Sequence, residues 1–127
     1  MIVTPAKPED LPAIREIVTR CGLHVEGLDY AKWTGVLLVC TRQGQVIGFI
    51  SALPGHPYAV ITEIGVLPEH QKSRACSKLM EGMELILRSL GCTAWSGYVG
   101  EKRLLSDTLT TWGAECTGAG SMWIRRL

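Results

Sequence analysis

Hydrophobic and polar positions change their period several times along the chain, and each change predicts a new element. In residues 11–21, apolar side chains recur every three or four positions, which predicts an amphipathic helix that ends at Gly22. The same period returns in residues 79–90 and 102–112, and each of these stretches is also followed by a glycine. Apolar runs rich in β-forming residues predict strands at residues 2–4, 36–41, 45–53, 58–67 and 92–99.

The order of these elements predicts a single α+β domain over residues 1–127. Short turns join the strands of the first half, which indicates antiparallel pairing, and the long helix after residue 74 indicates a parallel crossover. We therefore expect a central mixed sheet with helices on both faces, closed by a hairpin of residues 114–116 and 121–127. The segment 23–35 predicts either a short helix or a loop that Tyr30 and Trp33 fold over the core.

The composition narrows the class of protein. Apolar residues make up 46% of the chain and charged residues 20%, which is typical of a globular domain. The net charge of +1 gives no electrostatic reason to expect nucleic acid or an anionic membrane as a partner. The apolar run at residues 36–40 is far too short to cross a bilayer, and residues 1–5 lack the features of a signal peptide. We expect a cytoplasmic protein.

The cysteines indicate reduced thiols. They are odd in number, widely scattered and without C-x-x-C spacing, and no histidine lies at a ligand-like offset from a pair of them. A disulfide framework or a zinc site is therefore not expected, and no metal is predicted. The five are Cys21, Cys40, Cys76, Cys92 and Cys116.

Residues 64–80 stand at the centre of the predicted fold. They contain the end of an apolar strand, a short polar turn and the start of a long helix. The first N–H groups of a helix have no intrahelical partner and lie at the positive end of its dipole. A turn of this kind is therefore a natural site for an anion.

The element order and this stretch together resemble the GNAT superfamily of acetyl-CoA-dependent N-acetyltransferases. The family signature is a strand ending in V-x-P, a turn written Q/R-x-x-G-x-G/A, and a helix that begins with a leucine pair. Here residues 66–68 match the strand end, Gln71 matches the first turn position, and residues 79–80 match the helix start. Residues 111–115 resemble the aromatic-x-x-Gly-Phe region of the family, and residues 121–127 resemble its last strand.

The resemblance implies acetyl-CoA as co-substrate and an N-acetyltransferase activity on a primary amine. The cofactor of the family lies in a V-shaped gap between two parallel strands, which correspond here to residues 58–67 and 92–99. Its pantetheine arm bonds to strand backbone, which corresponds to Ile64, Gly65 and Val66. Its pyrophosphate lies on the N–H groups of the turn, which correspond to those of Gln71, Lys72, Ser73, Arg74, Ala75 and Cys76.

Two positions of the turn depart from the family pattern, because Arg74 and Cys76 stand where it has glycines. Glycine serves there when the backbone needs a positive φ or when a ligand approaches closely. The Arg74 guanidinium can bind phosphate directly, or it can fill the site and close it. A solvated polar turn that binds nothing is the alternative.

Glu63 is the candidate general base, because it is the only acid inside the predicted strand at the gap and family members use carboxylates of this strand. The alternative is that Glu63 bonds a neighbouring strand or helix. His56 and His70, on loops near the gap, are further candidates for the base. A Cys76 thiolate, activated by the helix N-terminus, would be a nucleophile instead.

The general acid is the second departure. The position of the tyrosine that protonates the leaving thiolate in many family members is occupied here by Leu109. Tyr98, Thr110 and Thr111 are the available substitutes, and Tyr98 is the one we carry forward.

Two functions follow from the sequence. The first is acetyl transfer to a small-molecule or peptide amine. The second is a catalytically inactive GNAT-fold module, acting as a CoA-binding regulator or as a structural or interaction protein. The closing hairpin also presents an edge through which a homodimer could form.

Overall fold

The computed structural model describes residues 1–23, 29–98, 110, 113–116 and 122–127. Its centre is a seven-stranded sheet in the order β1-β2-β3-β4-β5-β7-β6. The pair β4–β5 is parallel and the other neighbouring pairs are antiparallel. The strands are β1 (Ile2–Pro5), β2 (Val36–Arg42), β3 (Gln45–Leu53), β4 (Tyr58–Val66), β5 (Ala94–Tyr98), β6 (Glu115–Cys116) and β7 (Met122–Arg126).

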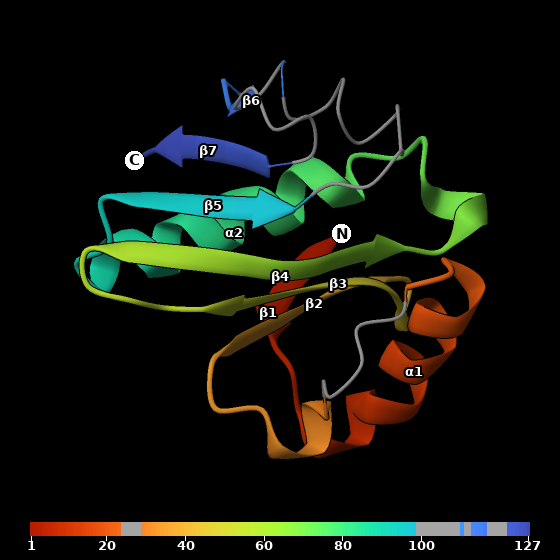
Figure 1. The fold of residues 1–127 in the computed structure, drawn as a ribbon. Helices are drawn as coiled ribbons and strands as arrows, with labels where there is room; N and C mark the ends of the chain where they lie inside the picture. The colour runs from red at the N-terminus through yellow and green to blue at the C-terminus, as the bar shows by residue number, and fades with distance from the viewer. Residues whose placement is uncertain (24–28, 99–109, 111–112, 117–121) are drawn as a thin grey trace.

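Two helices cover opposite faces of this sheet (Figure 1). They are α1 (Leu11–Arg20) and α2 (Ala75–Ser89), and α2 connects the parallel strands β4 and β5. Three short 3-10 turns lie in the connections: η1 (Pro8–Asp10), η2 (Tyr30–Lys32) and η3 (Pro68–His70). The structure thus confirms the α+β class, the mixed sheet and the crossover that the sequence predicts.

The core follows from the alternation of side chains along the strands. In β2, Leu38 and Cys40 are buried under α2, whereas Val39 between them is buried under α1. Each helix contributes the apolar stripe that its period predicts. The stripe of α1 includes Ile14 and Ile17, and that of α2 includes Leu79, Met80, Met83 and Leu87.

The predicted ends of the helices at 11–21 and 79–90 are also confirmed. Gly22 and Gly91 follow them with positive φ values of 64° and 86°, which are left-handed conformations that glycine adopts without strain. The predicted helix at 102–112 lies outside the described residues, except for Thr110. The predicted hairpin is present, because β6 and β7 pair antiparallel.

Membrane-spanning helices, metal clusters and disulfides are absent from the described residues. None of their helices is long and apolar enough to span a membrane. No cluster of three or more metal-ligating side chains occurs among them. Four cysteines in this part of the chain are not in disulfides: Cys21, Cys40, Cys76 and Cys92.

Candidate functional site

The parallel strands β4 and β5 pair along only part of their length. Residues 58–61 of β4 pair with residues 94–97 of β5, whereas β4 stays paired with β3 as far as Val66. In Figure 1, β4 continues past the tip of β5 toward the start of α2. Within the described residues, the stretch 62–66 is therefore paired on its β3 side alone, and its other edge is open.

The pairing with β3 shows which backbone groups face the open edge. The Leu67 N–H donates to the Ile47 carbonyl at 2.8 Å, so every second residue before Leu67 also turns its backbone toward β3. By this alternation, Gly65 faces β3, and Ile64 and Val66 face the open edge. Of the three residues predicted to bond a pantetheine arm, two are thus placed to do so through their backbone.

A β-bulge marks the beginning of the open stretch. Glu63 lies opposite Ser51 and Ile61 lies opposite Ala52, so Thr62 is left without an opposite residue. The Thr62 and Ser51 hydroxyls are 2.7 Å apart, and Glu63 is adjacent on the same face of the sheet. The bulge therefore brings the side chains of two consecutive residues, Thr62 and Glu63, to the face that α1 covers.

Glu63 is buried, with 7% of its surface exposed. One carboxylate oxygen, Oε1, accepts a hydrogen bond from the Tyr30 hydroxyl. The other, Oε2, is buried and has no hydrogen-bond partner among the described residues. An unpartnered buried oxygen is costly, and native proteins retain such groups mainly where a ligand, a water or a reaction uses them.

Tyr30 donates this hydrogen bond in its protonated form. Burial raises the pKa of the Tyr30 phenol well above its ordinary value, and the bond to Glu63 raises it further. The phenol therefore stays neutral throughout the physiological range, so that Glu63 acts as the acceptor of the pair.

The ring of Tyr30 is fixed by aromatic neighbours. Its centroid lies 5.3 Å from that of Trp33 in a tilted arrangement and 5.5 Å from that of Phe49 in an edge-to-face arrangement. The Asp29 carboxylate accepts from the Ala31 N–H at 3.0 Å and caps the turn that carries Tyr30. In its described part, residues 29–35, the segment therefore combines a short 3-10 turn with aromatic rings packed over the core.

Gly35 brings this segment close to the sheet. A Cβ at that position would lie 2.1 Å from the Ala52 carbonyl oxygen, which is rigid strand backbone. We expect Gly35→Ala to destabilise the fold by about 1–3 kcal/mol, as overpacking of a tight contact does. Urea denaturation followed by circular dichroism measures the change in the free energy of unfolding. Gly97→Ala is the matched control, since its Cβ would meet its nearest neighbours at 3.5 Å, an ordinary contact; an equal loss in both variants would contradict the explanation.

The turn between β4 and α2 offers several free donors. The Ser73 Oγ accepts from the Ala75 N–H at 3.2 Å and donates to the His70 carbonyl at 2.5 Å, which fixes the turn. Four backbone N–H groups in and after this turn have no acceptor among the described residues: those of Lys72, Arg74, Cys76 and Ser77. Cys76 and Ser77 belong to the first turn of α2, where N–H groups have no intrahelical partner.

The two departures from the glycine pattern cause no backbone strain. Arg74 has φ −84° and ψ 14°, and the only non-glycine residue with positive φ in the described part of the chain is Gln43. The Arg74 side chain is exposed, so it does not fill the turn. Burial raises the pKa of the Cys76 thiol to about 11, which opposes the thiolate that the helix N-terminus suggested.

Two side chains already contact the open edge of β4. The Val66 carbonyl accepts from the Gln71 Nε2 at 3.1 Å and from the Cys21 Sγ at 3.2 Å. Among the six turn residues predicted to bind pyrophosphate, Gln71 differs in that its side chain hydrogen-bonds the backbone of β4. The Gln71 N–H itself lies 3.4 Å from the Pro68 carbonyl.

The remaining candidates are not gathered at the bulge. His56 is exposed and precedes β4, seven residues from Glu63, which corresponds to about 20 Å along extended chain. His70 lies in η3, after the end of β4. The backbone of Tyr98 pairs with Met122, but its side chain lies outside the described residues, as do Leu109 and Thr111. The predicted general acid therefore stays a prediction.

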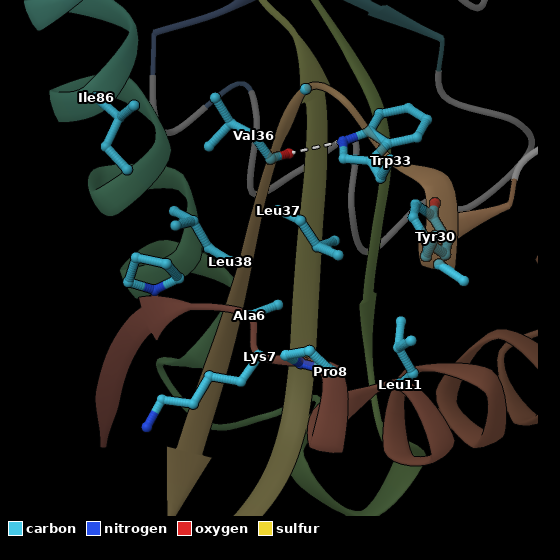
Figure 2. A pocket seen from close by; sticks show the side chains of 13 residues that line it. Ala6, Lys7, Pro8, Leu11, Tyr30, Trp33, Val36, Leu37, Leu38 and Ile86 are labelled. Carbon is cyan, nitrogen blue, oxygen red and sulfur yellow. Dashed lines mark hydrogen bonds between the residues drawn. The ribbon is translucent and has the colours of Figure 1, made fainter.

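A cavity of about 400 Å³ lies at the edge of the sheet where β1 ends. Figure 2 shows its largely apolar wall, with Leu37 and Leu38 of β2 near the middle and the Trp33 Nε1 donating to the Val36 carbonyl at 3.1 Å. None of the described residues predicted as base or cofactor contacts lines it. Tyr30 belongs to both places, since its ring lines this cavity and its hydroxyl contacts Glu63.

Sequence reasoning alone missed Tyr30 and Ser51 as members of the Glu63 cluster. The sequence offers a signal for Ser51, because it is a polar residue within an apolar run. In the structure its side chain is completely buried. The sequence places Tyr30 only in a segment whose form it leaves open. Its contact with Glu63 spans 33 positions of the sequence, so no local pattern could indicate it.

The sequence model described as "Acetyltransferase (GNAT) family" matches residues 8–103. No curated protein sequence matches the chain.

Many solved structures share the fold. Ard1 from Thermoplasma volcanium has a TM-score of 0.85 at 16% identity, covering 99% of this chain and 97% of its own. A ribosomal-protein-alanine N-acetyltransferase from Brucella melitensis has a TM-score of 0.78 at 16% identity, covering 100% of both chains. A GNAT family acetyltransferase from the same organism, solved in complex with acetyl-CoA, has a TM-score of 0.76 at 17% identity, covering 99% and 87%. At these identities the likeness concerns the fold.

Proposed function

The chain belongs to the acetyltransferase (GNAT) family, and from this premise we propose that it transfers an acetyl group from acetyl-CoA to a primary amine. The observation that carries the proposal is the buried Glu63 carboxylate, with one oxygen unpartnered, at the start of the open stretch of β4. A buried carboxylate with a vacant acceptor is the group that an amine needs as it loses a proton.

The chain offers suitable groups for acetyl-CoA along this stretch. The backbones of Ile64 and Val66 would bond the pantetheine arm at the open edge of β4. The N–H groups of Lys72, Arg74, Cys76 and Ser77, at the positive end of α2, would bind the pyrophosphate. The exposed Arg74 side chain adds a guanidinium that can pair with phosphate oxygens.

The reaction then requires little covalent chemistry from the protein. Acetyl-CoA supplies a thioester that is already activated toward amines. The chain orients the two reactants in the gap, which accounts for much of the rate by proximity. As the amine nitrogen forms the amide bond and the carbon–sulfur bond breaks, Glu63 accepts a proton from the nitrogen through Oε2. The Tyr30 phenol, which is neutral throughout the physiological pH range, donates a hydrogen bond to Oε1.

The acceptor class is tested by turnover. The protein is incubated with acetyl-CoA and a panel of primary amines that includes polyamines, amino acids and peptides with free N-termini, and thiol release is followed together with the mass of each amine. We expect at least one amine to gain an acetyl group with one CoA released per transfer. Binding of acetyl-CoA without transfer to any amine would favour the alternative, a CoA-binding module without catalysis.

A further inference from the structure

Three residues from three strands form a row on the face of the sheet that α1 covers. Leu37 of β2 lies opposite Ser51 of β3, and Ser51 lies opposite Glu63 of β4. Tyr30 of η2 lies over this row, with its hydroxyl bonded to Glu63 and 3.1 Å from the Ser51 Oγ. The only side chain that hydrogen-bonds the Glu63 carboxylate, among the described residues, therefore comes from outside the sheet.

We propose that Tyr30 is a positioning residue for Glu63: its hydroxyl holds one carboxylate oxygen so that the other, Oε2, is presented to the acceptor amine. This inference rests on the proposed function, since it gives Tyr30 a role in the same reaction. Tyr30 itself contacts neither the amine nor the thioester in this account. It acts through Glu63.

The hydrogen-bond inventory supports this direction. A tyrosine hydroxyl has one proton and two lone pairs, and a carboxylate can only accept. The Tyr30 proton therefore points to Glu63. The one Ser51 proton is left to donate to the Tyr30 oxygen at 3.1 Å or to the Glu63 backbone carbonyl at 3.5 Å, and in either case Ser51 accepts from Thr62 at 2.7 Å. When Ser51 donates to Tyr30, the three hydroxyls form one continuous chain of donors toward Glu63, and such chains strengthen each bond by polarisation.

The position of the hydroxyl is set by contacts that are independent of Glu63. The ring is packed between Trp33 and Phe49, and the Trp33 indole is in turn bonded to the Val36 carbonyl at 3.1 Å. The cap from Asp29 fixes the turn below it. A donor held in this way restricts the carboxylate to one orientation, and a small set of orientations is what a base needs to meet an amine productively.

Tyr30→Phe tests the role because it keeps the ring and removes only the hydroxyl. We expect kcat to fall about tenfold, the loss typical for one hydrogen bond to a charged group, with the KM for acetyl-CoA unchanged. In a Glu63→Gln background the same substitution should cause no further loss, because the group through which Tyr30 acts is already gone. Equal losses in both backgrounds would overturn the inference while leaving the proposed function intact.

Tyr58→Phe is the matched control. Tyr58 is 68% exposed at the start of β4, and its hydroxyl has no hydrogen bond to the described residues, so the kcat of this variant should equal that of the wild type. A comparable loss in this variant would mean that the tenfold effect is not specific to the Tyr30 hydroxyl and would contradict the inference.

A second measurement does not depend on turnover. The unfolding equilibrium constants of the wild type, Tyr30→Phe, Glu63→Ala and the double variant give the coupling between Tyr30 and Glu63, with alanine in place of glutamine because glutamine can still accept from Tyr30. We expect a coupling of about tenfold, as for a hydrogen bond to a charged acceptor. Independent effects on unfolding would overturn the inference whatever the activity. If coupling is found in a wild-type protein that transfers no acetyl group, then the bond exists, but the positioning role falls together with the proposed function.

Discussion

Glu63→Gln is expected to lower kcat for acetyl transfer by about 100- to 1000-fold, while the affinity for acetyl-CoA stays that of the wild type. Gln has the same shape as Glu and can still accept from Tyr30, but it cannot take a proton from the amine. Loss of a positioned base costs a reaction about two to four powers of ten. Steady-state kinetics on the best amine of the panel, with calorimetric titration of acetyl-CoA, measure both quantities.

The control for this variant is Glu81→Gln, which makes the same chemical change at an exposed position of α2. It should retain the activity of the wild type. An unchanged kcat in Glu63→Gln would remove Glu63 from the mechanism. A parallel loss of acetyl-CoA affinity would instead indicate that the substitution had disturbed the gap, and that Glu63 is a structural residue.

Ser73→Asp is expected to weaken acetyl-CoA binding by about 100-fold. The Ser73 hydroxyl accepts from the Ala75 N–H, and an aspartate can make the same contact, but it loses the donation of Ser73 to the His70 carbonyl. A negative charge at the start of α2 interacts favourably with the helix dipole and offsets part of that loss of stability. The same charge would lie beside the bound pyrophosphate, and like charges at an interface cost several kcal/mol.

Ser73→Asn separates the charge from the change of side chain. Asn is nearly the same size as Asp and also caps helices, but it is neutral. It should bind acetyl-CoA far more tightly than Ser73→Asp does, and the difference between the two should shrink as the salt concentration rises. Equal affinities for the two variants would mean that the pyrophosphate does not lie at this turn.

Most of the fold could be predicted because its signals are local. The apolar period of residues 11–21 and the glycine that follows it predict α1 from neighbouring residues alone, and Gly22 indeed has a positive φ. The short turn at Gly44 fixes β2 against β3 in the same way. These patterns need no knowledge of the rest of the chain, so the sequence was sufficient to predict them.

The candidate site was only partly predictable because it is assembled from distant segments. The open edge of β4 depends on where its pairing with β5 ends. The placement of Glu63 depends on a bulge at Thr62 that no glycine or proline marks. Tyr30 reaches Glu63 only because the segment before β2 folds back over the sheet. The sequence could therefore name the base candidate but not the residue that holds it.

The turn shows a different case, in which one of the two difficulties that the sequence rule indicates, a backbone with positive φ, does not occur at Arg74. Glycines at the positions of Arg74 and Cys76 would have suited a backbone with positive φ, but the backbone of Arg74 is in an ordinary conformation. The number of free N–H groups, rather than the glycines, is what the turn offers to a diphosphate. Arg74 and Cys76 each contribute one of them.

The central claim is that the open edge of β4 and the turn before α2 bind acetyl-CoA, and calorimetric titration of the wild-type protein with acetyl-CoA and with free CoA tests it most directly. We predict one site per chain with a dissociation constant in the micromolar range for both. No binding at millimolar concentrations of either would contradict it.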